Sequence, residues 1–271
     1  KRTDMKKTLL AAALLGCTLA AHAADQSEAA HPGAVVVTAT RTAITVDDAL
    51  SSVSVITRAD IERLQPLSLA DLLTGLPGVS FANAGGYGQQ TSLFMRGTNS
   101  AHTLVLIDGV RIGGIGSGLA AFEQIPVEQI ERIEVVRGPR SSLYGADAIG
   151  GVIQIFTRRG SQDGALRPSF SVTTGSQNLL RGQFGLSGGS EHAWYNLAVG
   201  AQYTRGINSC RVGAGEVFAG CFTDEPDRDA YRNRNLSANG GYRWDNGVQL
   251  SGTWLRSLGE IHFDGSYQNR S

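Results

Sequence analysis

The chain has 271 residues and is formally neutral, with 24 basic and 24 acidic side chains. Removing residues 1–23 takes away four basic and one acidic side chain, which leaves 20 against 23 and a net charge of −3. With this net charge the protein is not expected to bind nucleic acid through overall electrostatic attraction. After residue 23 the sequence contains no apolar run long enough for a helical membrane span, but dispersed alternation could still encode membrane-spanning strands.

The first 23 residues predict export. Met5-Lys6-Lys7 is a basic start, the apolar stretch TLLAAALLGCTLA follows, and Ala21-His22-Ala23 is an A-x-A cleavage site. Residues 1–23 are therefore interpreted as a signal peptide with a few upstream residues, and the mature chain is expected to start at Ala24. A lipoprotein processing site at Cys17 is the alternative reading, and it also means export.

Residues 24–44 are predicted to be a periplasmic N-terminal segment. Within it, HPGAVVVTATR (31–41) is β-prone and apolar, and nothing near it in the sequence covers it. A free extended segment of this kind suits a partner that adds its own strand through main-chain hydrogen bonds. Docking of the segment on the rest of the chain is the other possibility, and it is compatible with a resting state.

Residues 45–160 are predicted to form a compact α/β domain. Strands are expected at 52–57, at 103–112 with a turn at Asp108-Gly109, at 131–138 and at 150–159. Helices are expected in 57–64 and 68–78, because Thr57 with Asp60 and Ser68 with Asp71 have the spacing of capping boxes, and Gly75 is the expected stop of the second helix.

Three glycine-rich loops interrupt this domain, at 83–90, 113–118 and 145–151. The second, GGIGSG, follows a strand, but its glycines are spaced G-x-G-x-G and too few residues follow for a phosphate-binding helix, so a nucleotide site is not expected. The arginines at 96, 137 and 140 could pair with Glu123, Glu128, Glu131 or Glu134, or could be ordinary surface residues.

Residues 168–271 change character and alternate strictly between apolar and polar positions. In 235–244, for example, Leu236, Ala238 and Tyr242 share one face. The same pattern occurs in 179–188, 193–204 and 248–254, which predicts membrane-spanning β-strands with lipid outside and a polar lumen. A soluble sandwich would alternate too. Strands of about ten residues, and short connections (188–192, 245–247) alternating with a long one (206–228), favour the membrane.

About five strands fit into 168–271, too few to close a barrel. A barrel that holds a domain of this size is of the 22-stranded plugged class. The predicted fold is therefore an α/β plug domain followed by the first strands of a large antiparallel transmembrane β-barrel, and the sequence is expected to be the leading part of a longer chain.

An ordered series of motifs carries a family resemblance: AVVVTA (34–39), LLTGLPGV (72–79), LFMRGTNSAHTLVLIDGVR (93–111) and IERIEVVRGPRSSLYGADAIGGVIQI (130–155). With the signal peptide and the strands that follow, the sequence resembles the TonB-dependent outer-membrane receptors. Within that family, the loops and the segment GPRSSLYGADAIGG are most similar to those of cobalamin (vitamin B12) receptors.

The resemblance implies a function, partners and a location. The chain would belong to a bacterial outer-membrane transporter that takes up cobalamin with energy supplied by the TonB complex, and a ferric siderophore is the alternative ligand. It would be surrounded by outer-membrane lipid. A passive porin would not need the plug, and a periplasmic enzyme would need a catalytic constellation, which is not found.

The resemblance also implies specific residues. The TonB box would lie at 33–39, comprising Ala34, Val35, Val36, Val37, Thr38 and Ala39. The ligand would contact Gln90, Ser92, Asn99, Ile115 and Gly116, although the loop at 112–118 is one residue shorter than in cobalamin receptors.

The acidic loop at 222–231 has the density of hard oxygen ligands that suits Ca²⁺, and a solvated acidic loop is the alternative. The resemblance to cobalamin receptors implies Asp227 and Asp229 as the Ca²⁺ ligands. No other cofactor is expected. Cys210 and Cys221 are the only cysteines after the signal peptide, and export makes a disulfide between them plausible.

Overall fold

The computed structural model describes residues 35–36, 44–45, 52–114, 118–209 and 228–262. The chain divides into the units 1–34 and 35–271, and all described residues belong to the second. Its first element is a two-residue strand, β1 (Val35–Val36), which pairs antiparallel with β2 (Ile44–Thr45).

A five-stranded mixed sheet forms the centre of the plug. Its order is β3-β8-β9-β6-β7. The strands are β3 (Ser52–Ile56), β6 (Thr103–Ile107), β7 (Val110–Arg111), β8 (Ile130–Arg137) and β9 (Gly151–Thr157). Only the β6–β9 pair is parallel, and β3 lies at an edge. The strands predicted in this domain are confirmed.

Two short helices cover one face of this sheet. They are α2 (Arg58–Leu64) and α3 (Leu69–Leu73), and both begin with a complete capping box, Thr57 with Asp60 and Ser68 with Asp71. The side-chain hydroxyl accepts one free N–H of the first turn while the acidic side chain accepts the N–H of the cap residue. The sequence predicted Gly75 as the stop of the second helix; the structure ends the helix at Leu73, and Gly75 takes a positive φ of 90° just beyond.

Two further plug elements have no counterpart in the sequence prediction. One is the hairpin of β4 (Val79–Asn83) and β5 (Thr91–Met95), and the other is the single turn α4 (Ser141–Tyr144). One-turn 3₁₀ helices connect other parts, namely η1 (Ser100–His102), η2 (Phe122–Gln124), η3 (Val127–Gln129) and, in the following sheet, η4 (Ser176–Asn178).

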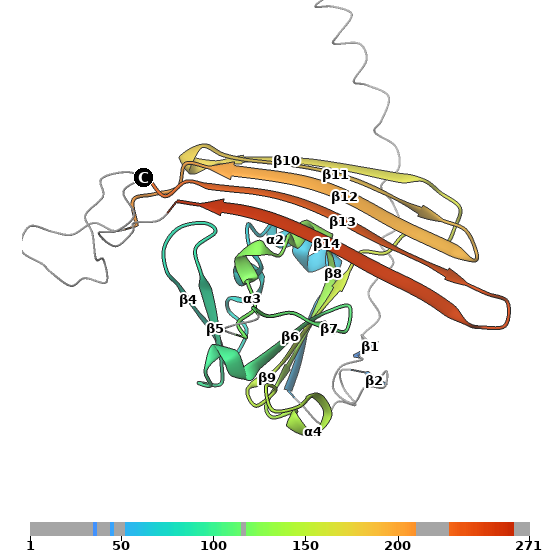
Figure 1. Cartoon of the computed structure of the whole chain (residues 1–271), viewed down its shortest axis with the longest axis horizontal. Coiled ribbons are helices and arrows are strands. Elements are labelled where there is room, and N and C mark those ends of the chain that lie inside the picture. Colours follow the sequence, from blue (N-terminus) through green and yellow to red (C-terminus); the bar gives the residue numbers. More distant parts are fainter. Residues whose placement is uncertain (1–34, 37–43, 46–51, 115–117, 210–227, 263–271) are drawn as a thin grey trace, which may run out of the picture. The chain divides into compact units, whose positions relative to one another are not determined.

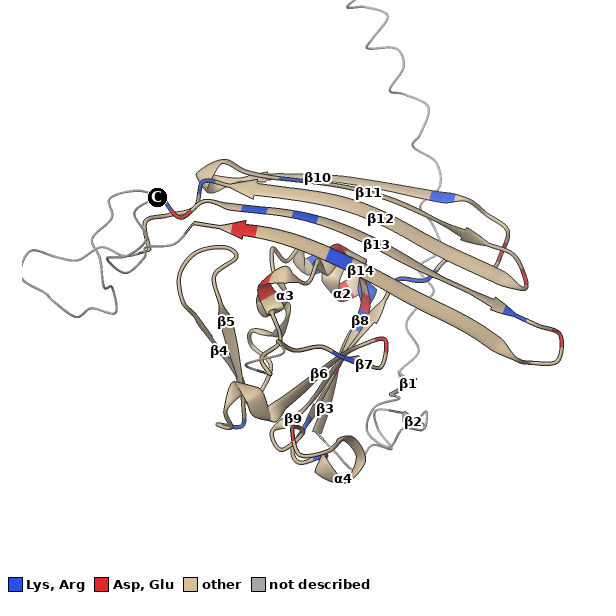
Figure 2. Ribbon diagram, in the orientation of Figure 1, with Lys and Arg blue, Asp and Glu red and all other residues tan. Residues whose placement is uncertain are grey.

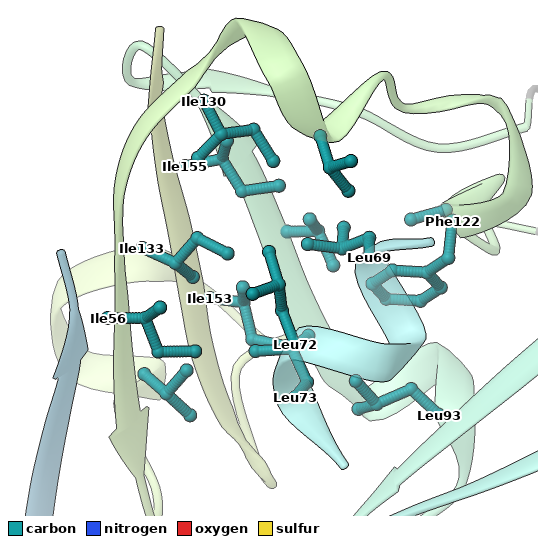
Figure 3. Close-up of a cluster of buried hydrophobic side chains, with 14 of the residues drawn as sticks. Ile56, Leu69, Leu72, Leu73, Leu93, Phe122, Ile130, Ile133, Ile153 and Ile155 are labelled. Carbon is teal, nitrogen blue, oxygen red and sulfur yellow. The ribbon is translucent and has the colours of Figure 1, made fainter. Parts of the chain in front are cut away.

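The plug core lies between the sheet and these helices (Figure 3). Leu69 and Leu73 of α3, Ile133 of β8 and Ile153 of β9 are all fully buried. Burying a side chain of this kind contributes roughly 1.5–3 kcal/mol, so the core gives the plug a stability of its own.

The last five strands form a single antiparallel sheet in chain order (Figure 1). They are β10 (Arg167–Gly175), β11 (Leu179–Gly189), β12 (Ala193–Thr204), β13 (Tyr231–Arg243) and β14 (Gln249–Ile261). We call them the wall. Phe170, Phe184, Val199 and Leu236 occupy one row across neighbouring strands and are all exposed. The opposite face carries Arg181, Asn196, Asn233 and Asn235, and it contacts the plug.

The wall has two distinct ends. Thr204, Tyr231 and Ile261 lie at the end that carries the connection 205–230, and we call this the long-loop end. The short connections 190–192 and 244–248 lie at the other end, as the alternating loop lengths predicted. Among the described residues, no helix has both the length and the apolar character to cross a bilayer.

Candidate ligand-binding and coupling sites

The predicted coupling segment is described only in part. Val35 and Val36 form β1, and their register partners are Thr45 and Ile44. The remaining residues of the predicted TonB box, Ala34, Val37, Thr38 and Ala39, lie outside the described residues. A ladder of two residue pairs is a weak attachment, because short isolated strand pairs are marginal in water.

The predicted ligand residues that the structure describes lie on or beside the β4–β5 hairpin. Gln90 is exposed at its tip, and its carbonyl accepts the N–H of Ala84 at 3.0 Å. Ser92 is half-buried on β5. Asn99 is exposed, and its Oδ1 accepts the N–H of Ala101 at 3.1 Å, which leaves its amide NH₂ as a donor. Ile115 and Gly116 lie outside the described residues.

The hairpin loop reaches the long-loop end of the wall. Gly88, with φ of 80°, packs so closely on the ring of Tyr231 that a Cβ atom would lie 2.2 Å from the ring. Gln89 Nε2 donates to the carbonyl of His262 at 3.1 Å. Only a glycine fits at position 88, so the loop is positioned by the wall as well as by its own strands.

A cavity of about 430 Å³ lies below this loop, between α3, η2 and the wall. Tyr87 and Tyr231 line it together with two carboxylates, those of Asp71 and Glu123. The described hairpin loop forms one side of this cavity, so a change in the loop would alter its shape.

Glu123 is the unusual group in this cavity. Its Oε2 atom is buried and has no hydrogen-bond partner among the described residues. Burial raises the pKa of this carboxyl above its ordinary value of 4.5, and the N–H groups of Glu123 itself and of Thr91 offset part of that rise. Since Thr91 begins β5, this carboxylate connects the hairpin to η2.

The segment 122–129 is the main contact of the plug with the wall, and we call it the docking strip. Gln124 Oε1 accepts from Asn233 Nδ2 at 2.9 Å, and Gln129 Nε2 donates to Asn235 Oδ1 at 3.0 Å. The hydroxyl of Tyr231 donates to the carbonyl of Glu123 at 3.2 Å. These bonds join neutral amide, hydroxyl and carbonyl groups, which each contribute about 1 kcal/mol.

Arg181 adds a charged contact between the plug and the wall. It lies on β11 and is 8% exposed. Its Nη1 donates to Glu128 Oε1 at 2.5 Å and its Nε to Gln202 Oε1 at 3.2 Å. The carbonyls of Pro66 and Leu67 complete the site.

Asp108 forms a second connection, in the β6–β7 turn. Its carboxylate accepts the N–H of Thr157 at 2.9 Å and the hydroxyl of Thr253 on β14 at 2.9 Å. The same side chain thus closes the turn inside the plug and attaches it to the wall. The sequence singled out the Asp-Gly turn but gave no signal for its partner on β14.

Two of the glutamates suggested as partners of Arg96, Arg137 or Arg140 form their described ion pairs with other arginines. Arg137 donates instead to the hydroxyls of Ser52 and Ser54 on β3, the former at 2.9 Å. Burial lowers its pKa, and the nearby charge of Arg96 lowers it further. Glu128 pairs with the wall residue Arg181, and Glu134 pairs with Arg132 at 2.9 Å.

In the connection between β12 and β13, Asp229 is 2% exposed and contacts Ser209 near the start of the loop. Its carboxylate accepts the N–H of Ser209 at 2.9 Å as well as the hydroxyl of that residue. Asp227, Cys210 and Cys221 lie outside the described residues. Within the described ranges no cluster of three potential metal ligands occurs. A carboxylate is a suitable Ca²⁺ donor, but this one is engaged by Ser209, so the calcium and disulfide assignments stay predictions.

Comparison with known proteins shows which proteins this chain is similar to. Residues 45–152 match the TonB-dependent Receptor Plug Domain family. The vitamin B12 transporter BtuB of Photobacterium profundum is 38% identical over 272 residues, which cover 97% of this chain and 41% of that protein.

Solved structures of siderophore receptors have a similar fold. The siderophore receptor PirA of Acinetobacter baumannii has a TM-score of 0.63 and 26% identity, over 80% of this chain and 33% of that one. A ferric enterobactin receptor (PfeA) structure from Pseudomonas aeruginosa has a TM-score of 0.60 and 25% identity, over 81% and 34%.

Residues 45–152 belong to the TonB-dependent Receptor Plug Domain family, and a plug followed by antiparallel wall strands with an apolar outer face has the architecture of a TonB-dependent outer-membrane receptor. Among its curated relatives, the one described above is a vitamin B12 transporter. The chain spans about two fifths of that relative's length and about a third of the solved receptors.

Proposed function

We propose that the protein takes up cobalamin across the outer membrane with energy supplied through TonB. The observation that carries this proposal is the 38% identity to a vitamin B12 transporter over 97% of the chain. The aligned region includes the plug and the first wall strands. The ferric siderophore alternative has support from the solved structures, which are siderophore receptors.

The ligand site in this proposal is the outward side of the plug. Gln90, Ser92 and Asn99 present amide and hydroxyl groups from the β4–β5 hairpin and the turn after it, and Ile115 with Gly116 would complete the site. Ser100 Oγ accepts the N–H of Leu93 at 3.1 Å, which draws the turn of Asn99 back onto β5. Polar and small residues on a fixed turn suit a large ligand rich in hydrogen-bonding groups.

The coupling element is the segment around β1. TonB would add a strand to residues 34–39 in place of β2, since only two residue pairs oppose the exchange. Calcium at Asp227 and Asp229, and a Cys210–Cys221 disulfide, would order the long connection above the ligand site.

The deciding experiment is ligand binding by the complete receptor in outer-membrane vesicles. Cyanocobalamin and a panel of ferric siderophores, including ferric enterobactin, are titrated in parallel. We expect saturable binding of cyanocobalamin that no siderophore displaces. Saturable siderophore binding without cyanocobalamin binding would establish the alternative.

A further inference from the structure

The cavity of about 430 Å³ below the β4–β5 hairpin loop lies beside the predicted ligand residues. Thr91, which lines it, stands between Gln90 and Ser92 in the sequence. Its volume is at the lower end of the roughly 300–1,000 Å³ of pockets that enclose a drug-sized molecule. A corrinoid is much larger than such a molecule, so only a group that projects from the corrinoid would fit.

The lining of this cavity is acidic. It contains the carboxylates of Asp71 and Glu123 and, among the described residues, no arginine, lysine or histidine. The acidic residue of α3 is Asp71, and the hairpin loop 84–90 carries no charge (Figure 2). Arg181, whose charge acts on both tyrosines of the cavity, is already paired with Glu128. An anionic group that entered the cavity would therefore meet uncompensated negative charge.

The two carboxylates differ in the partners that they already have. Asp71 caps α3, since its Oδ2 atom accepts the N–H groups of Leu67 and Ser68 at 3.0 and 2.9 Å. Glu123 Oε2 is buried and has no hydrogen-bond partner in the described part of the chain. A buried acceptor without a donor is unfavourable, and a donor that reaches it removes the penalty. Because Glu123 lines the cavity, a rotation of its side chain presents this oxygen to a group bound there.

Tyr87 adds a neutral polar group to the lining. Its hydroxyl forms no hydrogen bond with any residue that the structure describes. Burial raises the pKa of this hydroxyl, and the charge of Asp71 raises it further, so the group stays neutral and can donate or accept. The hydroxyl of Tyr231 is already engaged, because it donates to the carbonyl of Glu123 at 3.2 Å. The cavity therefore offers one carboxylate oxygen and one hydroxyl to a group that enters it.

We propose that this cavity is a subsite for a primary-amide arm of the corrinoid, and that Glu123 determines its specificity. The amide NH₂ of the arm donates to the Glu123 carboxylate, and the amide carbonyl accepts from the Tyr87 hydroxyl. An arm that ends in a carboxylate has no proton to donate at neutral pH, and Glu123 repels it. A negatively charged ferric siderophore is disfavoured for the same reason. The inference rests on the proposed uptake of cobalamin and identifies the part of the ligand that this subsite recognises.

The test uses the complete receptor in outer-membrane vesicles. The probes are cyanocobalamin and its monocarboxylic acids, in each of which one peripheral amide has been hydrolysed. The measured quantity is the ratio between the Kd of each acid and the Kd of cyanocobalamin at neutral pH. We expect at least one acid to bind the native receptor about tenfold more weakly than cyanocobalamin, or weaker still, because a buried acceptor is then left without its donor.

Glu123→Gln removes the negative charge and keeps a hydrogen-bond acceptor. We expect it to lower the ratio for that acid to about threefold or less, while the Kd of cyanocobalamin stays within about threefold of the native value. Glu131→Gln is the matched control, because Glu131 is an exposed glutamate of β8 outside the cavity lining, and it should leave the ratio unchanged. An unchanged ratio in Glu123→Gln, or an equal decrease in Glu131→Gln, would overturn the proposal.

A second variant tests the cavity itself. Ala70 of α3 lines it, and Ala70→Leu adds bulk on that side without changing a charged group. We expect cyanocobalamin to bind about fivefold more weakly, or weaker still, while the protease resistance of the plug and the heat-modifiable migration of the barrel are unchanged. Native-like affinity in this folded variant would show that no arm enters the cavity.

The same measurements separate this inference from the proposed function. Absence of cyanocobalamin binding to the native receptor would overturn the proposed uptake of cobalamin. Saturable binding of cyanocobalamin without discrimination against any of the monocarboxylic acids would overturn the subsite alone.

Discussion

The guanidinium group of Arg181 contacts four oxygen atoms from the wall and from two separate plug segments. These are the side-chain oxygens of Gln202 and Glu128 and the carbonyls of Pro66 and Leu67. Most other described contacts across this interface use neutral groups, for example Gln129 with Asn235, and the carboxylate of Asp108 accepts a hydrogen bond from the hydroxyl group of Thr253. A neutral bond can be exchanged for water at little cost, whereas a buried charge cannot. Arg181 therefore determines where the plug sits on the wall.

We predict that Arg181→Met destabilises the attachment of the plug by about 1–3 kcal/mol, because the substitution leaves the half-buried carboxylate of Glu128 without its charged partner. The measurement is the urea dependence of protease cleavage in the plug. In the double variant with Glu128→Gln, much of the loss should be recovered. Arg243→Met is the control and should change stability by no more than about 0.5 kcal/mol. Additive effects of the two substitutions would show that the pair is not energetically coupled.

Glu123 supplies a pH dependence. Because burial raises the pKa of its carboxyl above 4.5, folding favours the protonated form. The stability that this group contributes is fully present below its unfolded pKa and is lost as the pH rises through the folded pKa. Glu123→Gln should therefore make the plug more resistant to unfolding than the native protein at pH 7, with the difference vanishing near pH 4. Protease-monitored melting at the two pH values checks this, and an equal difference at both would contradict it.

At the scale of elements, features set by neighbouring residues could be predicted from the sequence, whereas contacts between distant residues could not. Both helix starts followed from capping boxes, and the wall strands followed from strict alternation. The β4–β5 hairpin was not predicted from the sequence, because its strands have only five residues each and are joined by a glycine-rich connection. The contact of Arg181 with Glu128 joins residues 53 positions apart. No sequence periodicity encodes such a partner, so this ion pair could be identified only from the three-dimensional structure.

The two-residue strand β1 leads to a prediction about coupling. Proline at position 36 removes a main-chain N–H that any added strand would need. We expect Val36→Pro to abolish cobalamin-dependent growth on limiting ligand while cyanocobalamin binding to whole cells stays unchanged. Val36→Ala keeps the N–H and serves as the control, with growth close to that of the native protein. Normal growth of the proline variant would show that this segment is not the coupling element.

The long connection between β12 and β13 contains the two cysteines of the mature chain. We predict that Cys210 and Cys221 are joined, since the exported loop meets an oxidising environment and the bridge would close a short segment. Mass spectrometry of a non-reduced tryptic digest should show the linked peptides, and prior reduction should separate them. Two thiols that alkylate without reduction would rule the disulfide out.

At the scale of the whole molecule, the plug and the wall are stabilised by different physics. The plug has an apolar core of its own, and the wall strands satisfy one another's main-chain groups. Between them the described contacts are side-chain hydrogen bonds, one largely buried ion pair, the packing of Gly88 on the ring of Tyr231 and the packing of Leu255 of β14 against the plug core. A polar interface of this kind lets a folded domain leave or shift without exposing a large apolar surface.

This difference predicts two separate unfolding transitions in the complete receptor. Urea competes for the side-chain hydrogen bonds and weakens the modest plug core, whereas the closed main-chain ladder of a membrane barrel resists it. Increasing urea should therefore make the plug sensitive to protease while the barrel keeps its heat-modifiable migration on gels, and removal of urea should restore protection. Only one buried charged pair crosses the described interface. Raising the salt concentration to about 0.5 M should therefore shift the urea concentration at the midpoint of plug unfolding only slightly. The Arg181→Met variant should respond to salt no more than the native protein. A single transition in which plug and barrel unfold together would mean that apolar contacts outside the described residues dominate their attachment.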